Sequence, residues 1–392
     1  MKFQNVCFGI PKEIMPGEKR VAAIPDTAGK MIARGAKVLL ERGAGEGACF
    51  SDEAYRLAGA EIVEDVEAIY GRADVILKVK EPKFNTGKGK HEVDMMRRGQ
   101  YLIAFLHPAF PGNHEMVKRI AAKGVISLTL DFIPRISRAQ SMDALTSMST
   151  VAGYKGVLMA ANHLPRFLPM VGTAAGMIQP AKVLVVGTGV AGLQSVATAK
   201  RLGAVVYGTD VRPEACEQAA SVGAKIIELN IPREFATGKG GYARKLPDEW
   251  LLREREILAD HVAQSDIIML SALIPGKIAP VIITEEMVKS MRPGSVIVDI
   301  AIDQGGNCEL TEPGAVAERY GVALIGIQNI PGTVAMSSTW MFAHNMYNFL
   351  ENLFDEGAVR LDAGDEIIST CILTRNGEIA NAGAREAMNL GG

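Results

Sequence analysis

The sequence predicts an α/β protein built from two doubly wound domains with mainly parallel sheets and an interdomain cleft. Its 392 residues exceed the roughly 250–300 at which a single hydrophobic core stops growing. Short β-branched runs alternate with segments of helical periodicity, which is typical of parallel sheets. With 48% hydrophobic, 6% aromatic and 22% charged residues, the composition is that of a globular α/β protein. We therefore expect two Rossmann-like domains.

The first domain is expected to comprise residues 1–140 together with residues 335–392. Its strand-like runs are VCFGIP, KVLLERG, DVILKVK, YLIAFLHPA and VISLTLDFIP. Helical segments are expected at Thr27–Ala33, Asp52–Ala58 and Glu115–Lys123. This alternation predicts a parallel sheet, here without a glycine fingerprint. The amphipathic segment Ser338–Leu353 should return the chain to this domain, which is then discontinuous.

The second domain is expected to comprise residues 141–334. It opens with an apolar-periodic segment, Ser141–Asn162, and a stretch of small residues, VGTAAGMIQPAK. Its strand-like runs are VLVVG, AVVYGTD, AKIIELN, DIIMLSA, SVIVDIA and ALIGIQN, with helices at Ala191–Leu202 and Glu214–Val222. The polar insert Pro232–Pro247, which carries Tyr242, has the composition of a mobile loop.

Charge and cysteine usage exclude several classes of partner. The net charge is −2 without any block of like charges, which argues against nucleic acid and anionic lipid as partners. The five cysteines are far apart and form no C-x-x-C pair, so we expect reduced thiols in a cytoplasmic protein. The histidines lack partners at metal-ligand spacing, and no metal site is expected. No apolar run is long enough for direct membrane insertion.

A glycine loop between a strand and a helix predicts a dinucleotide site. Gly187, Gly189 and Gly192 form G-x-G-x-x-G after the strand VLVVG and before the next helix. The first glycine permits the tight turn, the second lets the backbone approach the pyrophosphate, and the third allows close packing of helix and strand. The alternative interpretation is a glycine-rich turn in a nucleotide-free domain.

The acidic residue at the end of the next strand indicates the cofactor. Asp210 lies eighteen residues beyond Gly192, where a carboxylate accepts hydrogen bonds from the ribose hydroxyls and repels a 2′-phosphate. NAD(H) is therefore favoured over NADP(H). Arg212 offers an argument for NADP(H), but we interpret it as a solvated charge.

Two further segments follow strands of the second domain. Ala272–Lys277 follows DIIMLSA, at the carboxyl end of the sheet where doubly wound folds bind ligands. Val298–Cys308 ends another strand in the same way. Asp299 lies inside its apolar run and Asp303 lies beyond it, so position favours Asp303 for chemistry, with a solvated loop acid as the alternative.

These motifs, taken together, carry a family resemblance. They are PRISRAQSMD at Pro134–Asp143, TAAG at Thr173–Gly176, VAGLQSVATAKRLGA, the GGYA loop, ALIPGK and GGNC at Gly305–Cys308. On these residues the chain resembles the alanine dehydrogenase and proton-translocating transhydrogenase superfamily over essentially its whole length. Within it, PRISRAQSMD is similar to the signature of the NAD(H)-binding alpha subunit, or domain I, of transhydrogenases.

The resemblance implies the nicotinamide end of the site. Arg135, Gln140 and Asp143 would contact the ring and its carboxamide, with Thr146 where a serine is common. Tyr242 would close over the bound nucleotide as a lid. The complete set of implied cofactor contacts is Arg135, Gln140, Asp143, Thr146, Gly187, Gly189, Val190, Gly192, Asp210, Val211, Arg212, Tyr242, Ala272 and Leu273. The alternative for the signature is a helix start capped by Ser141 or Asp143.

The resemblance also implies the reaction and the partners. Hydride would pass between NAD(H) on this chain and NADP(H) on a partner subunit, coupled to proton translocation by membrane-spanning subunits. Such a transfer needs positioning and exclusion of water rather than a general acid or base. A homodimer is implied, located in the cytoplasm and peripheral to the inner face of the cell membrane through its partners.

Four residues fit the alanine dehydrogenase branch instead. Arg20 is common to both branches, whereas Lys80, His107 and Asp303 stand where the alanine dehydrogenases carry their substrate chemistry. Arg20 and Lys80 would hold the carboxylate and carbonyl oxygen of an amino or oxo acid, while His107 and Asp303 would move protons. A structural histidine and a surface lysine are the simpler interpretations. An NAD-dependent amino-acid dehydrogenase and a non-catalytic NAD-binding protein therefore stay open as alternatives.

Overall fold

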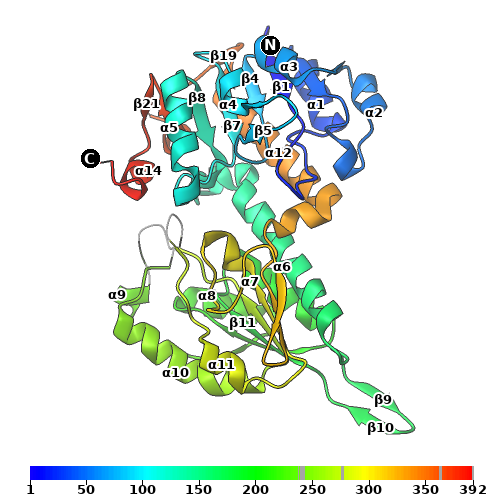
Figure 1. The fold of residues 1–392 in the computed structure, drawn as a ribbon, viewed down its shortest axis with the longest axis vertical. Helices are drawn as coiled ribbons and strands as arrows, with labels where there is room; N and C mark the ends of the chain where they lie inside the picture. The colour runs from blue at the N-terminus through cyan, green and yellow to red at the C-terminus, as the bar shows by residue number, and fades with distance from the viewer. Residues whose placement is uncertain (237, 239–242, 275–277, 362–363, 391–392) are drawn as a thin grey trace. The chain divides into compact units, whose positions relative to one another are not determined.

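The computed structural model describes residues 1–236, 238, 243–274, 278–361 and 364–390. Within them the chain divides into two compact units (Figure 1). Unit 1 comprises residues 1–148 and 332–392, and unit 2 comprises residues 149–331. Each unit has its own mainly parallel sheet, so the predicted α/β class with two parallel-dominated sheets is confirmed. Among the described residues, no helix has both the length and the hydropathy to cross a membrane.

The sheet of unit 1 has eight strands in the order β21-β20-β8-β7-β4-β1-β2-β3. The strands are β1 Cys7–Ile10, β2 Lys37–Glu41, β3 Glu61–Val63, β4 Val75–Leu77, β7 Tyr101–Ala104, β8 Ile126–Thr129, β20 Ile372–Arg375 and β21 Glu378–Ile379. The pairs from β3 to β8 are parallel, and β20 joins β8 in the antiparallel sense. The chain therefore completes this sheet only after it returns from unit 2.

Helices cover the sheet of unit 1, and small hairpins lie at its periphery. The helices are α1 Pro25–Ala33, α2 Asp52–Leu57, α3 Val66–Arg72, α4 Glu92–Met95, α5 His114–Lys123, α12 Ala335–Leu353, α13 Glu366–Cys371 and α14 Ala382–Ala387. The hairpin strands are β5 Phe84–Asn85, β6 Lys90–His91, β18 Phe354–Asp355 and β19 Ala358–Val359. Alternating strand residues, such as Leu77 and Ile76, belong to two different buried clusters. This alternation shows that both faces of the sheet are buried, as parallel sheets require.

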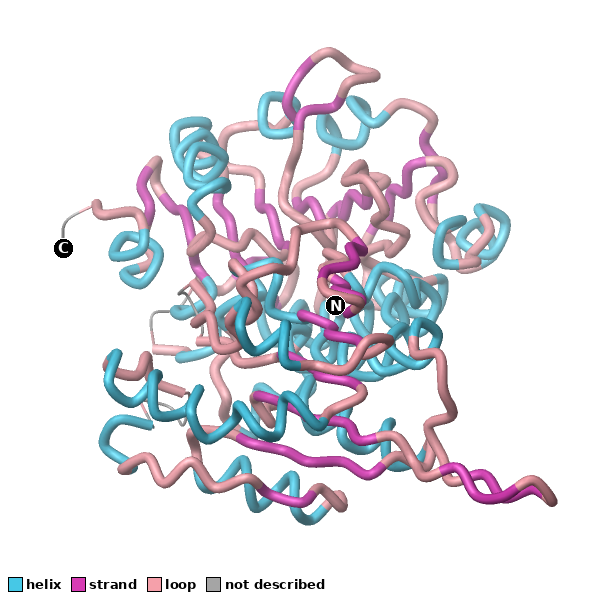
Figure 2. Tube along the Cα trace, turned by 60° about the horizontal axis from the view of Figure 1, so that its bottom comes forward, coloured by secondary structure: helices cyan, strands magenta, loops and turns pink. Residues whose placement is uncertain are grey.

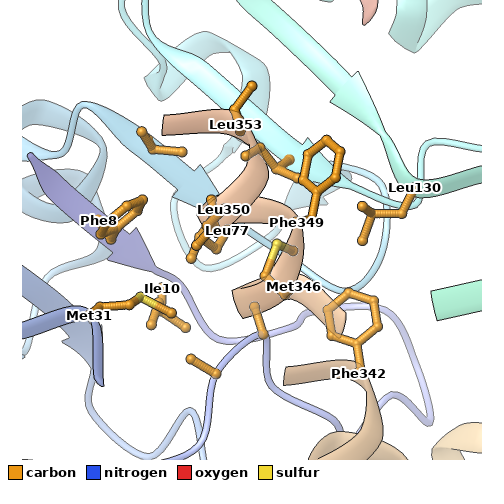
Figure 3. Packing of buried hydrophobic residues seen from close by; sticks show 14 of the residues in the cluster. Phe8, Ile10, Met31, Leu77, Leu130, Phe342, Met346, Phe349, Leu350 and Leu353 are labelled. Atoms are coloured by element: carbon orange, nitrogen blue, oxygen red, sulfur yellow. The ribbon is translucent and has the colours of Figure 1, made fainter. Parts of the chain in front are cut away.

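Helix α12 supplies a large part of the core on one face of the unit 1 sheet. Figure 3 shows its side chains among those of the strands and of α1. The labelled residues are Phe8, Ile10, Met31, Leu77, Leu130, Phe342, Met346, Phe349, Leu350 and Leu353. Phe342, Phe349 and Leu353 have no exposed surface. The helix begins three residues before the predicted Ser338, at Ala335, and ends at the predicted Leu353.

The sheet of unit 2 has seven strands in the order β13-β12-β11-β14-β15-β17-β16. The strands are β11 Lys182–Val186, β12 Val205–Thr209, β13 Lys225–Ile226, β14 Ile267–Leu270, β15 Val296–Asp299, β16 Val316–Arg319 and β17 Val322–Ile325. All neighbours are parallel except the edge pair β16–β17. β11 lies between β12 and β14, at the point where the strand order reverses and doubly wound sheets bind ligands.

Two buried clusters cover the two faces of the unit 2 sheet. The helices are α6 Ala144–His163, which crosses the unit boundary, α7 Val190–Arg201, α8 Pro213–Ser221, α9 Arg233–Ala236, α10 Asp248–Gln264 and α11 Glu285–Ser290. Leu184 of β11 packs in one cluster with Leu258 of α10, whereas Val185 packs in the other with Val196 of α7. The apolar runs noted in the sequence are therefore strands that are buried on both sides.

The stretch VGTAAGMIQPAK forms an antiparallel hairpin, which the sequence analysis did not predict. Its strands are β9 Val171–Thr173 and β10 Gly176–Ile178, and Figure 2 shows the hairpin extending away from the sheet of its unit. Gly176 adopts a φ of +132°, which only glycine takes readily. Met170, Met177 and Ile178 are 56%, 63% and 42% exposed, so the hairpin presents apolar side chains to its surroundings.

We predict that Phe349→Ala destabilises unit 1 by about 3–5 kcal/mol, since it removes a fully buried aromatic ring from the core on α12. The free energy of unfolding would be measured by urea titration followed by far-UV circular dichroism. Met336→Ala on the same helix is the control, because Met336 is 55% exposed and should change stability by no more than about 0.5 kcal/mol. Equal effects of the two substitutions would contradict the buried role of α12.

Candidate functional site

The glycine loop of unit 2 joins the end of β11 to the start of α7. Gly187 has a φ of +84°, and a Cβ atom there would lie 2.7 Å from the backbone nitrogen of Ala272. A Cβ on Gly192 would lie 2.0 Å from the carbonyl oxygen of Gly187. At Gly189, among the described residues, the nearest atom to an added Cβ is Nη2 of Arg212, at 3.6 Å. Gly187 and Gly192 are therefore required by packing, whereas Gly189 faces space that a ligand can enter.

Asp210 directly follows β12 and is only 8% exposed. Its Oδ2 accepts a hydrogen bond from the Thr188 backbone nitrogen at 2.8 Å, which ties the carboxylate to the glycine loop. Arg212 donates to both carboxylate oxygens, from Nε at 2.9 Å and from Nη2 at 2.8 Å. The side chain of Arg212 is 15% exposed. The interpretation of Arg212 as a solvated charge is therefore wrong, because the guanidinium group is paired and mostly buried.

Two side chains hold the segment after β14, one bonding to the glycine loop and the other reaching it from the loop after β15. Ser271 donates from Oγ to the Gly187 carbonyl oxygen at 2.7 Å. Asn307 accepts from the Ala272 nitrogen at 2.9 Å and donates to the Ala272 and Pro280 carbonyl oxygens at 2.9 and 2.8 Å. Asn307 is fully buried. It was not predicted from the sequence as a site residue, although it lies in the GGNC motif, and its place in that motif could have indicated its role.

In unit 2, those predicted cofactor contacts that the structure describes thus lie at one edge of the sheet. Val190 begins α7, Val211 and Arg212 follow Asp210, and Ala272 and Leu273 follow β14. The predicted lid residue Tyr242 lies outside the described residues. So do residues 275–277 of the ALIPGK segment.

Asp299 and Asp303 have different environments after β15. Asp299 is fully buried and accepts from the backbone nitrogens of Asn307 at 2.8 Å and Cys308 at 3.0 Å. Burial raises the pKa of the Asp299 carboxyl to about 6, against the opposing effect of these hydrogen bonds. Asp303 is exposed, and its Oδ2 accepts from the Asn329 nitrogen at 3.3 Å. Asp299 therefore holds the loop, and Asp303 is the carboxylate that this loop presents.

In unit 1, the signature segment lies just before α6. Residues Ser137–Met142 form a 3-10 helix, and the long α-helix begins only at Ala144. Asp143 accepts from Thr146 at both the backbone nitrogen (2.8 Å) and Oγ1 (2.6 Å), so it caps the start of α6. The cap offered as an alternative is therefore present. Arg135 and Gln140 are exposed and lie at the surface before it.

Lys80, His107 and Asp131 meet at the carboxyl ends of three neighbouring strands of unit 1. They follow or end β4, β7 and β8, which are adjacent in the sheet. Nζ of Lys80 lies 3.4 Å from Nε2 of His107, and Nδ1 of His107 lies 2.7 Å from Oδ1 of Asp131. His107 has a φ of +43°, in the left-handed region. Lys80 and His107 are candidates from the sequence, whereas Asp131 is not among them, although it stands near the end of the strand-like run VISLTLDF.

Hydrogen bonds fix the orientation of Asp131 and, through it, the imidazole. Its Oδ2 accepts from the backbone nitrogens of Leu106 and His107, both at 2.9 Å, and from the hydroxyl of Thr129. Although burial acts to raise the pKa of the Asp131 carboxyl, the adjacent imidazole and these donors lower it to about 2. The ring of Phe105 stacks on the imidazole, with an interplanar angle of 9°. An ionised carboxylate thus holds His107 with Nε2 directed to Lys80.

A buried charge network lies beneath Lys80. Lys78 is fully buried, with Nζ 2.9 Å from Oε1 of Glu92 and 3.2 Å from Oε2 of Glu13. Oε1 of Glu13 accepts from the backbone nitrogens of Val79 at 2.6 Å and Lys80 at 3.4 Å. Burial raises the pKa of the Glu13 carboxyl to about 7 despite the Lys78 ammonium group. The network fixes the backbone that carries Lys80.

Arg20 has strong partners of its own within unit 1. It is 2% exposed and donates to Glu18, from Nε at 2.8 Å and from Nη2 at 2.5 Å. Its Nη1 lies 2.9 Å from the sulfur of Met148. A substrate carboxylate bound by Arg20 would have to compete with Glu18 for the guanidinium group.

We predict that Asp131→Asn lowers the free energy of unfolding by about 2 kcal/mol at neutral pH, as expected for a carboxyl whose pKa falls from 3.8 to about 2 on folding. The sign follows because a carboxyl whose pKa is lower in the folded than in the unfolded chain stabilises the fold at pH values above its unfolded pKa. The difference from wild type should therefore shrink as the pH falls from about 4 to about 2. Urea unfolding at several pH values would measure it.

The control for this series is Asp260→Asn, which alters an exposed carboxylate on α10. It should leave stability nearly unchanged at every pH. A difference between wild type and Asp131→Asn that does not vary with pH would show that packing, rather than the charge, is responsible.

The chain matches known proteins over nearly its whole length. Residues 9–152 match the family described as alanine dehydrogenase/PNT, N-terminal domain, and residues 156–382 match its C-terminal domain. A Rhodospirillum rubrum protein, named as the first portion of NAD(P) transhydrogenase subunit alpha, is 42% identical over 377 residues, which cover 95% of this chain and 97% of that protein. The alanine dehydrogenase of Bacillus subtilis is 33% identical over 388 residues, which cover 95% of this chain and 92% of that protein.

A solved structure gives the same relationship. The transhydrogenase from Sinorhizobium meliloti aligns with a TM-score of 0.82 and 41% sequence identity, over 95% of this chain and 99% of that chain. The similarity therefore extends through both units.

Proposed function

The chain belongs to the alanine dehydrogenase/PNT family, and from this premise we propose that it is the NAD(H)-binding component of an NAD(P) transhydrogenase. The main support for the proposal is the local geometry of the glycine loop around Gly189. Among the described residues, a Cβ on its middle glycine would meet only the end of the Arg212 side chain, while the glycines on either side are held by packing and Asp210 is bonded to the same loop. A dinucleotide fits these features through its pyrophosphate and its ribose.

In the proposed reaction, hydride leaves the reduced ring of one nicotinamide nucleotide and adds to the oxidised ring of the other. NAD(H) is the nucleotide on this chain and NADP(H) the one on a partner subunit, with membrane-spanning subunits coupling the transfer to proton translocation. The amide nitrogens at the start of α7 would hold the pyrophosphate, and Asp210 the ribose. No proton moves in the transfer, so this chain has to bind, orient and exclude water.

The signature segment supports a role at the nicotinamide end. Gln140 offers one donor and one acceptor, which is what a carboxamide needs. Arg135 and Gln140 are exposed in the segment that follows β8, while Asp143 and Thr146 fix the helix start behind them. Tyr242 is proposed as the lid.

We also propose that the chain acts as a homodimer, at the inner face of the cell membrane through its partners. The β9–β10 hairpin supports this, because an isolated two-stranded hairpin is at best marginally stable and here exposes Met170, Met177 and Ile178. A second copy of the chain would cover these side chains.

We predict that the chain, combined with NADP(H)-binding and membrane-spanning transhydrogenase subunits, supports NADPH-dependent reduction of an NAD analogue. Gly189→Ala should abolish this rate and weaken NADH binding at least tenfold, or about 1.4 kcal/mol, because a Cβ would occupy the space proposed for the pyrophosphate. NADH binding would be measured by its fluorescence, and the rate by absorbance of the analogue.

Gly189→Ala suits this test because, among the residues that the structure describes, only the end of the Arg212 side chain lies within 4 Å of the added Cβ. Its thermal unfolding midpoint should therefore equal that of the wild type. Gly192→Ala is the contrasting variant and should destabilise the loop itself, since its Cβ meets backbone at 2.0 Å. Unchanged NADH binding by Gly189→Ala would overturn the proposed site.

A second candidate function is NAD-dependent amino-acid dehydrogenation of the alanine type. The observation that favours it is the contact between Lys80 and His107, with Asp131 orienting the imidazole. In such a reaction, the Lys80 ammonium group would polarise the carbonyl of an oxo acid while His107 exchanges a proton, and Asp303 and Arg20 would complete the set. The pairing of Arg20 with Glu18 makes this the second choice.

If this second function operates, the isolated chain should oxidise NADH rapidly in the presence of pyruvate and ammonia. His107→Asn should then abolish turnover and leave the NADH dissociation constant unchanged, since asparagine tolerates the left-handed backbone at this position. Full turnover by the variant would remove His107 from the mechanism. NADH binding without either reaction would instead favour the third alternative, a non-catalytic NAD-binding protein.

A further inference from the structure

We propose that Arg212 is a specificity-determining residue, which occupies the ribose-binding positions of Asp210 until a nucleotide displaces it. The inference rests on the proposed NAD(H) function. It adds that the site has an internal competitor, and that this competitor sets both the affinity for NADH and the discrimination against NADPH.

Four hydrogen bonds reach the carboxylate of Asp210. A carboxylate has about four acceptor positions, two on each oxygen. Oδ1 accepts from the backbone nitrogen and Nε of Arg212, both at 2.9 Å. Oδ2 accepts from the Thr188 nitrogen and from Nη2 of Arg212, both at 2.8 Å. All the acceptor positions are therefore in use, one on each oxygen by the guanidinium group.

The two acceptor positions occupied by the guanidinium group equal the number that the two hydroxyl groups of a ribose would need. Two hydroxyl groups require two acceptor positions on the carboxylate, whereas the two backbone donors can stay in place when a ligand arrives. Only the guanidinium bonds can be given up without moving the chain. Binding therefore exchanges two charge-assisted bonds from Arg212 for two bonds from the ribose hydroxyls.

The guanidinium group also lies over the glycine loop. Among the described residues, Nη2 of Arg212 is the nearest atom to a Cβ placed on Gly189, at 3.6 Å. Arg212 is the residue directly before α8, so its backbone is fixed at the start of that helix. After displacement it stays close to the adenosine ribose, where its charge would favour a 2′-phosphate that Asp210 repels.

Removal of the Arg212 guanidinium group should change the affinities for NADH and NADPH in opposite directions. Removing the guanidinium group frees Asp210 for the ribose, so NADH should bind more tightly. It also removes the cation that offsets the repulsion between Asp210 and a 2′-phosphate, so NADPH should bind more weakly. Arg212 thus weakens the binding of NADH, which speeds its release, and it reduces the preference of the site for NADH over NADPH.

The test compares dissociation constants for NADH and NADPH in wild type, Arg212→Met and Arg212→Lys. Arg212→Met keeps much of the side-chain length and should tighten NADH binding by about threefold to tenfold, as expected for the loss of a competing hydrogen-bonded charge. NADPH binding should weaken, and Arg212→Lys should lie between wild type and Arg212→Met for both nucleotides. Arg319→Met, which removes an exposed arginine of the same unit, should change neither constant.

A double-mutant cycle separates this role from a structural one. In an Asp210→Asn background, Arg212→Met should give no gain in NADH affinity, because the carboxylate for which the two compete is gone. Weaker or unchanged NADH binding by Arg212→Met, with an unaltered thermal midpoint, would overturn the inference while leaving the proposed function intact. Failure of the wild-type chain to bind NADH would instead overturn the proposed function itself.

Discussion

The parallel pairing of β11 with β12 and β14 is the constraint on which the proposed nucleotide site depends. Because parallel strands end at the same edge of the sheet, the pairing brings together the glycine loop, Asp210 and the segment at Ala272 from distant regions of the sequence. Ser271 then links the segment at Ala272 to the glycine loop, and Asn307 holds the same segment from the loop that follows β15. The pairing itself is stabilised by the burial of both sheet faces, where alternate residues enter separate clusters.

Much of this arrangement could be predicted from the sequence, because its signals are local. The strand–glycine loop–helix order around Gly189 and the spacing to Asp210 predict a dinucleotide-binding turn from one short segment. Buried strands of unit 2 are continuous apolar runs, and these were identified without knowledge of their neighbours. The helix at Ala335–Leu353 was also identified from its period, with only its first turn missed.

The features that escaped prediction depend on contacts between distant residues. Nothing local distinguishes Asp131 from a strand-end acid until β7 and β8 pair and place it beside His107. The partner of Arg212 lies only two residues away, but the burial of the guanidinium group appears only in the folded chain, so the sequence favoured a solvated charge. The hairpin at residues 171–178 was missed because its small residues give no strand periodicity. Tyr242 stays a prediction.

The discontinuity of unit 1 has a consequence for biosynthesis. Helix α12 and strand β20 belong to the core and sheet of this unit, yet they follow the whole of unit 2 in the sequence and leave the ribosome after it. The first 148 residues must therefore wait, with an apolar face uncovered, while the continuous unit 2 is made and can fold. A chain interrupted before Phe342 would lack the side chains that close this core, which makes truncated products natural clients for chaperones and proteases.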